Sequence, residues 1–228
     1  MGAGSLMKNI FRGHPRLASI GSPIVNRILG GNRFRVKGKG NKITLNHSML
    51  FRSRIIISGN NNEITVGDGS ILYHTTVTIR GNNNRVRIGE NVTCKVGDFS
   101  FEDDGGSIGI GDRTTISGHT HLACIEGKSI RIGKDCLFSS DIIFRVGDSH
   151  SILDMDGKRI NPSQDIEVGD HVWISYNTTL TKGSAVARDS IVGTGAIVTR
   201  KFTTPNVVIA GVPASVIKTN INWDPKRI

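Results

Sequence analysis

A spacing of 22 residues recurs through the middle of the chain and limits its fold more than any other feature. Aliphatic–glycine pairs mark it at Val66-Gly67, Ile88-Gly89, Ile110-Gly111 and Ile132-Gly133. Within each unit the spacing is six, and the residues predicted to point inward are Val66, Leu72, Thr78, Ile88, Cys94, Ser100, Ile110, Ile116, Leu122, Ile132, Phe138 and Phe144, then Val168, Ile174, Leu180, Val186, Val192 and Val198. Six residues are too few for a helix and a turn. Short strands joined by tight bends, three to a coil, predict a parallel β-helix.

Each 22-residue unit is three hexads plus four extra residues at one corner of the coil. Two of these corners carry the sequence GNNN, at 59–62 and 81–84. Asparagine tolerates left-handed backbone angles, so turn chemistry alone explains these residues. Stacked coils would also align identical corners, which allows ladders of side-chain amides between them.

The hexads, the segment GDHVWI (169–174) and the tail TRKFTTPNVVIAGVPASVIK (199–218) resemble the hexapeptide-repeat acetyltransferases. The resemblance covers roughly 59–218. It implies a left-handed parallel β-helix, a homotrimer with active sites between subunits, and acetyl-CoA as the acetyl donor. The motifs GDSHSI and GKRIN, within 147–161, are most similar to the branch that acetylates hydroxyls of polysaccharides or sialic acids.

The repeat divides the chain into three parts. Residues 1–36 are a basic N-terminal segment, of which 1–6 look like an expression-tag remnant, and 37–204 form the β-helix. Residues 205–228 are expected to be a C-terminal cap, with a short helix over 213–219 that opens at a proline. The N-terminal segment reads as an interrupted helix or as a basic surface arm.

Charge is concentrated at the N-terminal end. The net charge is +10, yet residues 1–54 hold 11 basic and no acidic residues, which leaves −1 for the remainder. Such a block favours an anionic partner, either an acidic polymer, a membrane surface or nucleic acid, although a solvated basic face explains it equally well. No apolar run approaches the roughly 20 residues that a spanning helix needs. Three cysteines occur without a C-x-x-C pair, which favours small core positions and a reducing, cytoplasmic setting. The basic block is also compatible with a membrane-peripheral location.

An insertion replaces one corner of the repeat and is the expected position of the chemistry. The inward series jumps by 24 residues between Phe144 and Val168, which leaves a loop at about 146–163. Long loops on rigid scaffolds are often functional. The loop contains one histidine, His150, and a neutral imidazole suits removal of a hydroxyl proton near pH 7. A solvated surface histidine is the alternative, but the resemblance implies that His150 is the catalytic base.

Acceptor contacts are expected beside this loop. If the segment SGHTHL is extended, His119 and His121 point to one side of a strand and Thr120 to the other. We expect both histidines, with Asp148 in the loop, to bind the acceptor. A zinc site of the kind found in β-helix carbonic anhydrases is the competing interpretation. The histidine spacing argues against zinc, and no metal is expected.

The resemblance places the donor on the C-terminal coils. Trp173 precedes an inward hexad position and should face outward, either against the donor or against a neighbouring subunit. The other positions that match donor contacts are Ser175, Tyr176, Thr194, Thr199, Arg200 and Lys218, with Lys201 as an addition. Basic side chains among them would meet the phosphates of acetyl-CoA.

The sequence therefore predicts an acetyl-CoA-dependent O-acetyltransferase of a sugar or polysaccharide. The hexads are equally compatible with an N-acetyltransferase that acts on an amino sugar or sugar nucleotide. A third interpretation, from another class, is a non-enzymatic β-helix scaffold that binds anionic surfaces through its basic end. No specific nucleic acid is expected as a partner.

Overall fold

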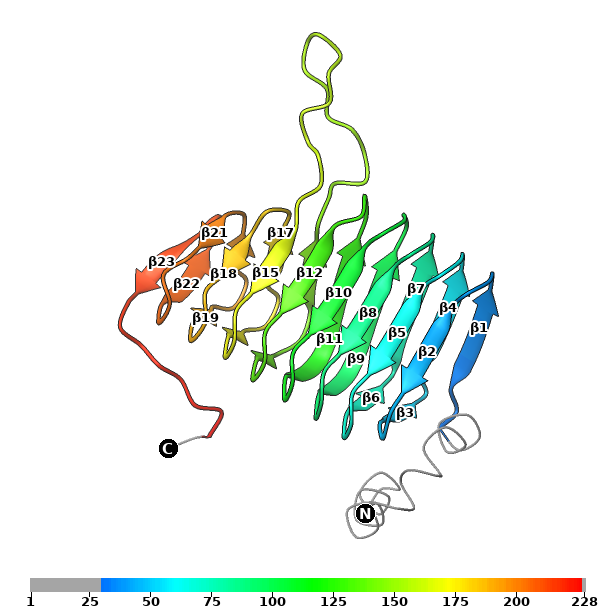
Figure 1. The fold of residues 1–228 in the computed structure, drawn as a ribbon. Helices are drawn as coiled ribbons and strands as arrows, with labels where there is room; N and C mark the ends of the chain where they lie inside the picture. Colours follow the sequence, from blue (N-terminus) through cyan, green and yellow to red (C-terminus); the bar gives the residue numbers. More distant parts are fainter. Residues whose placement is uncertain (1–29, 227–228) are drawn as a thin grey trace.

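The computed structural model describes residues 30–226, which form a β-solenoid of stacked coils (Figure 1). Each complete coil contributes three strands, so the solenoid is a prism with three faces. Strands of one face pair in parallel with those of the coils before and after, and β22 (Val208–Gly211) with β23 (Ala214–Lys218) is the antiparallel exception among the described strand pairs. We call the three faces 1, 2 and 3. Faces 1 and 2 form one 15-stranded sheet because the long strands β9 (Thr93–Phe101) and β11 (Thr115–Cys124) continue from one face to the other, whereas face 3 is a separate 8-stranded sheet.

The strands follow the three faces in chain order. Face 1 consists of β3 (Met49–Phe51), β6 (Ile71–Tyr73), the first parts of β9 (Thr93–Phe101) and β11 (Thr115–Cys124), β13 (Leu137–Phe138), β16 (Trp173–Ile174), β19 (Ile191–Val192), β22 (Val208–Gly211) and β23 (Ala214–Lys218). Face 2 consists of β1 (Arg33–Lys37), β4 (Arg54–Ser58), β7 (Thr75–Arg80), the second parts of β9 and β11, β14 (Ile142–Arg145), β17 (Thr179–Thr181) and β20 (Ile197–Val198). Face 3 consists of β2 (Lys42–Leu45), β5 (Glu63–Val66), β8 (Arg85–Ile88), β10 (Ser107–Ile110), β12 (Ser129–Ile132), β15 (Ile166–Val168), β18 (Ala185–Val186) and β21 (Lys201–Phe202).

The predicted inward series fills the core, with two exceptions. Sixteen of its members are buried, and the rings of Phe138 and Phe144 stack with their centroids 5.7 Å apart. Thr78 and Ser100 were predicted to point inward, and this is wrong, because they lie between the buried pairs of β7 and β9. The cause is one fewer residue at the corner between faces 1 and 2. In β9 the next buried hydrophobic residue, Phe99, follows Cys94 by five positions. In β11 Leu122 follows Ile116 by six, and the register of the two strands shifts at this corner.

The asparagine corners use both predicted devices. Asn61 and Asn83 have φ of 55° and 58°, in the left-handed region. Asn82 continues a side-chain ladder, since the Nδ2 of Asn60 donates to its Oδ1 at 3.2 Å and its own Nδ2 donates to Asp104 Oδ1 at 3.1 Å. Identical corners of adjacent coils are therefore tied to one another along the prism.

All three cysteines are buried and free. Burial raises the pKa of Cys94 to about 11 and that of Cys124 and Cys136 to about 12. These thiols stay protonated and fill small core positions, as predicted.

The C-terminal end is closed by a hairpin and not by the predicted helix. Residues 214–218 are strand β23, which pairs antiparallel with β22. The last coil would otherwise expose an unpaired strand edge, and the β-branched Val216 and Ile217 favour an extended backbone. A cap was correctly expected, but its secondary structure was not.

The N-terminal end is open in the described part of the chain. Strand β1 begins at Arg33, within the predicted N-terminal segment, and its inward residues Phe34 and Val36 are 36% and 44% exposed. The expected helix or arm at 7–35 falls almost wholly outside the described residues. Among residues 30–226 no helix is long and apolar enough to span a membrane.

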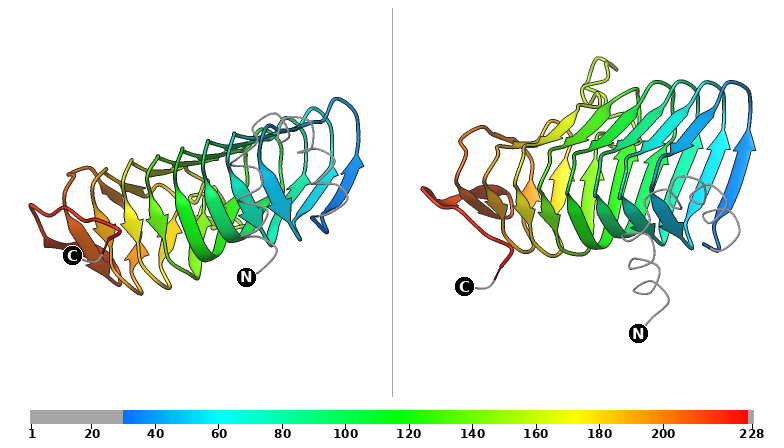
Figure 2. Two further views of the ribbon diagram at one scale, coloured as in Figure 1. Left: turned by 90° about the horizontal axis from the view of Figure 1, so that it is seen from below. Right: turned by 60° about the horizontal axis from the view of Figure 1, so that its bottom comes forward.

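The insertion leaves the prism at the corner between faces 2 and 3. Residues 146–165 connect β14 to β15 and extend well beyond the coils (Figure 1). A single bridge between Leu153 and Arg159 holds its outer part as a hairpin-like arm. The two further views show the coils as a nearly straight stack from which this arm departs (Figure 2).

Candidate active site

Asn161 fixes the backbone of the loop around the predicted base. Its side chain is 5% exposed. The Nδ2 group donates to the carbonyl oxygen of His150 and to Oδ2 of Asp148, both at 2.8 Å, and Oδ1 accepts from the backbone N–H of Ile152 at 2.7 Å. One buried amide therefore determines the path of residues 148–152.

Two ion pairs attach this loop to the rigid coils. Arg159 pairs with Glu126 at 2.6 Å, and Lys182 pairs with Asp148. The Lys182 ammonium, then the Asn161 amide, hold the pKa of the Asp148 carboxyl below its usual range. Likewise the Arg159 guanidinium lowers the pKa of Glu126. Both carboxylates stay ionised at neutral pH, so the two ends of the loop stay attached to the coils.

The imidazole of His150 is exposed at the edge of the prism. It makes no hydrogen bond to any group in the part of the chain that the structure describes. Its neighbour Ser149 has φ of 64° and accepts from a guanidinium N–H of Arg145 at 3.2 Å. The main chain of His150 is thus held while its ring is free to meet a substrate.

His121 lies beside the base of the loop on face 2. As predicted, Thr120 points into the core while His119 and His121 point out. His121 Nδ1 lies 3.1 Å from Asp98 Oδ2, which orients its ring. A cavity of about 150 Å³ adjoins this ring, and its lining residues are Ser100, Glu102, His121, Ala123, Cys124, Ile125, Arg145, Gly147 and Ser149.

The other two predicted acceptor contacts do not line this cavity. His119 lies two residues earlier in the strand, with its Nδ1 3.8 Å from Asp141 Oδ1. Asp148 is bonded to Lys182 and Asn161, so it serves as an anchor of the loop in this structure. Among residues 30–226 no group of three or more His, Cys, Asp or Glu side chains could hold a metal ion.

Trp173 lies on face 1, away from the loop. Its side chain points outward, with the residue 37% exposed, as predicted. A second tryptophan, Trp223, lies beside it with ring centroids 6.1 Å apart, and stacks on His171 at 4.3 Å. Trp223 Nε1 also donates to the carbonyl oxygen of His171 at 2.9 Å. The C-terminal segment therefore folds back on the coil that carries Trp173.

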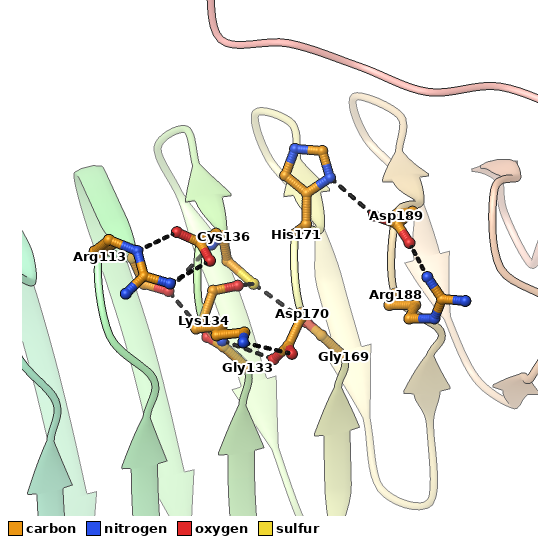
Figure 3. Close-up of polar contacts among 11 residues, drawn as sticks. Arg113, Gly133, Lys134, Cys136, Gly169, Asp170, His171, Arg188 and Asp189 are labelled. Atoms are coloured by element: carbon orange, nitrogen blue, oxygen red, sulfur yellow. Dashed lines mark hydrogen bonds and ion pairs between the residues drawn. The ribbon is translucent and has the colours of Figure 1, made fainter.

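The corner that carries His171 holds several charged contacts, of which His171–Asp189 and Arg113–Asp135 join adjacent coils. Figure 3 shows His171 directed at Asp189, with Nδ1 3.0 Å from Oδ1, and Arg188 on the other oxygen of the same carboxylate. Arg113 likewise pairs with Asp135 at 2.7 Å. These contacts make a rigid corner next to the face that carries Trp173.

The remaining predicted donor contacts follow Trp173 along the C-terminal coils. Ser175 is buried, and the exposed positions are Tyr176, Thr194, Thr199, Arg200, Lys201 and Lys218. The turns of Tyr176 and Thr194 lie on adjacent coils, since the N–H of Gly195 donates to Tyr176 O at 2.9 Å. These positions are spread over the C-terminal coils, since Trp173 and Lys218 lie on face 1 and Lys201 lies on face 3. Their exposed aromatic and basic side chains are of the kinds that contact an elongated, phosphate-bearing donor.

One chain does not bring the predicted base, His150, and Trp173 together. The loop leaves at the corner of faces 2 and 3, whereas Trp173 lies on face 1, which is opposite that corner in a three-sided prism. No sequence pattern pointed to Asn161 and Lys182, which hold the loop, because their side-chain contacts with residues 148–152 span 9 to 34 residues. Trp223 had a weak signal as one of two tryptophans.

Comparisons with known proteins agree with this architecture. The chain is 31% identical over 208 residues to a polysialic acid O-acetyltransferase of Neisseria meningitidis. This match covers 87% of this chain and 92% of the relative. It is 37% identical over 121 residues to a polysialic acid O-acetyltransferase of Escherichia coli O1:K1, of which it spans 38%. No protein-family model matches the chain.

Solved structures give the same result. The crystal structure of the polysialic acid O-acetyltransferase OatWY superposes with a TM-score of 0.80 at 30% identity, covering 86% of this chain and 92% of that one. The polysialic-acid-specific acetyltransferase NeuO gives a TM-score of 0.78 at 33% identity, covering 86% and 90%. The solenoid is thus the left-handed parallel β-helix that the family resemblance implies. The chain belongs to the hexapeptide-repeat acetyltransferases, enzymes that take their acetyl group from acetyl-CoA.

Proposed function

We propose that this enzyme transfers the acetyl group of acetyl-CoA to a hydroxyl of an acidic, sialic-acid-containing polysaccharide. The observation that carries the proposal is the match to the Neisseria meningitidis enzyme over 92% of that protein's length. The basic N-terminal part of the chain supports an acidic acceptor, because opposite charge raises the local concentration of a polyanion.

His150 is the general base in this proposal. A ring nitrogen takes the proton of the acceptor hydroxyl while the oxygen attacks the thioester carbonyl carbon. The carbonyl oxygen gains negative charge, which backbone N–H groups near the loop stabilise. The carbon–sulfur bond then breaks, and the CoA thiolate leaves and takes up a proton. The bonds of Asn161 support this role because they fix the main chain of His150 and leave its ring free.

The acceptor occupies the region between the loop and face 2. His121, oriented by Asp98, and Arg145 offer a hydrogen-bond donor and a positive charge beside the cavity. His119 contacts the acceptor further along the same strand. Asp148 joins them when the acceptor displaces part of its bonding to Lys182, and otherwise supports the loop.

Acetyl-CoA occupies the C-terminal coils. Trp173 packs against the acetyl and pantetheine end, and Ser175, Tyr176 and Thr194 lie along the pantetheine. Thr199, Arg200, Lys201 and Lys218 are the group that meets the phosphates. The exposure of these basic side chains supports this arrangement, because a buried or paired cation could not approach a phosphate.

The active enzyme is a homotrimer in which each site uses two chains. The separation of His150 and Trp173 on opposite sides of one prism supports this assembly, since a neighbouring chain can supply the missing half. We also propose a cytoplasmic, membrane-peripheral location. Three buried free thiols fit a reducing compartment, and the basic end fits an anionic lipid surface.

A panel of acceptors tests the proposed function. Acetyl transfer from labelled acetyl-CoA is measured with polysialic acid, a uronic-acid polymer, neutral sugars and amino sugars. We expect polysialic acid to have the highest kcat/KM. Acetylation of amino sugars alone would establish the N-acetyltransferase alternative, and failure to bind CoA would favour the non-enzymatic scaffold.

A further inference from the structure

The first three coils present a strip of unpaired basic side chains on face 2. Its members, which we call the basic strip, are Arg33, Arg35 and Lys37 of β1, Arg54 of β4 and Arg80 of β7. All five are exposed, and none makes an ion pair within residues 30–226. The outward positions of β1, β4 and β7 include no acidic residue.

Several basic residues elsewhere on the prism are neutralised by partners. Arg131 on face 3 pairs with Asp165 and Glu167, and Arg113 at the neighbouring corner pairs with Asp135. The five cations of the basic strip are therefore available to an external anion.

Strand register connects the basic strip to the cavity at the loop. One outward column runs from Arg33 and Arg54 through Thr76 and Asp98 to His121. The next column runs from Arg35 through Ile56, Thr78, Ser100 and Ala123 to Arg145. Four strand spacings of about 4.8 Å separate β1 from β11, so the far end of the strip lies about 19 Å from His121. Its near end, Arg80 on β7, lies two spacings, or about 10 Å, from β11.

We propose that face 2 is an extended track for the acidic polysaccharide, which runs from the loop cavity to the basic strip. Successive carboxylates of the polymer bind the strip while an internal sugar lies at His150. The outward hydroxyls of Thr76, Thr78 and Ser100 lie between these two ends and can bond to sugar hydroxyls. This inference rests on the proposed function and adds a dependence on acceptor length, because a short acceptor fills the cavity without reaching the strip.

A charge-reversed pair on the strip tests the track. The full-length enzyme is compared with Arg54→Glu/Arg80→Glu, and with Arg85→Glu/Arg87→Glu as a control. The control residues are exposed on face 3 of the same coil as Arg80 and carry the same change of charge. Affinity for long polysialic acid is measured without donor, and KM is measured for the long polymer and for a sialic acid trimer.

We expect the face 2 variant to weaken polymer binding, and to raise polymer KM, by at least about fivefold, since each exposed ion pair contributes a modest free energy. Its kcat and its KM for the trimer and for acetyl-CoA should stay within about twofold, as should all values of the control. Equal effects of the two variants, or an unchanged polymer affinity, would overturn the track. The track would also be overturned if the face 2 variant lost binding to phosphatidylglycerol vesicles but kept its affinity for the polymer. The basic strip would then be a binding site for a membrane surface. Failure of the proposed function is seen separately, as a wild-type enzyme that acetylates no sialic acceptor.

Discussion

His150 is held through its main chain while its ring makes no hydrogen bond within residues 30–226. A base of this kind should be removable without disturbing its surroundings. We expect His150→Ala to lower kcat by at least about 100-fold and to leave the KM for acetyl-CoA within about twofold, because the base acts on the acceptor. Steady-state kinetics checks this. The control is His47→Ala, which should retain full activity. His47 is also an exposed histidine, and its ring contacts Asp68.

Trp173 offers an exposed indole on the face opposite the loop. If acetyl-CoA packs on this ring, Trp173→Ala should raise the donor KM by about tenfold and also lower kcat, because aromatic burial contributes about 1–2 kcal/mol. Donor titrations check the effect. A variant with wild-type donor KM would remove Trp173 from the donor site.

The catalytic loop depends on a few contacts at its base. Lys182→Met removes the partner of Asp148, and Asn161→Ala removes four hydrogen bonds. We expect each change to lower kcat by about five- to tenfold while the melting temperature changes by less than about 2 °C, since the loop lies outside the core. Lys158→Met, an exposed lysine of the same loop, is the matched control. A large fall in melting temperature would show that the loop also supports the coils.

Acid should release the same loop. Because the pKa of Asp148 is lowered in the folded protein, its ion pair is fully present above the ordinary value of about 3.9 and is lost as pH falls below it. Limited proteolysis within 148–163 should therefore begin below about pH 4. Cleavage that is equally fast at pH 7 would contradict this anchoring.

The corners between faces 2 and 3 stack through glycine. Gly59 has φ of 150°, and a Cβ there would lie 1.9 Å from the carbonyl oxygen of Gly81. Gly59→Ala should cost about 2–3 kcal/mol of unfolding free energy and lower the melting temperature by about 5–10 °C. Gly109→Ala is the control, because a Cβ at that position has no neighbour within 4 Å. Similar melting temperatures for the two variants would contradict the close stacking.

The periodic part of the solenoid could be predicted from sequence, and its departures could not. From Val168 to Val198 every strand and turn takes six residues, so spacing alone identifies the inward side chains. Thr78 and Ser100 were misassigned because one residue is missing at a corner, which leaves the 22-residue period unchanged. The site shows the same limit. His150 stands out by type, whereas Asn161 and Trp223 act through contacts that only folding creates.

The whole molecule separates its predicted base from its predicted donor face, and this leads to an assembly prediction. Light scattering should give a homotrimer. Mixing His150→Ala with Trp173→Ala under conditions that exchange subunits should restore part of the activity, because some interfaces then combine two intact halves. An active monomer of about 25 kDa, or no recovery after exchange, would contradict shared sites.

Charge also acts at the scale of the whole molecule. The Debye length falls from about 30 Å at 0.01 M salt to about 8 Å at 0.15 M. The KM for an acidic polymer should rise several-fold across this range, while the KM for a short neutral acceptor changes little. If both rise equally, salt acts on acetyl-CoA, whose phosphates are also anionic.

The most direct test identifies the bond that the enzyme makes. Polysialic acid freed of O-acetyl groups is incubated with acetyl-CoA and the enzyme, and the product is analysed by NMR before and after mild alkali. We predict new acetyl signals on sialic acid hydroxyls, which mild alkali removes as expected for esters, and none of these signals with His150→Ala. Alkali-stable acetyl groups on nitrogen, or equal ester formation by His150→Ala, would contradict O-acetylation with His150 as the base.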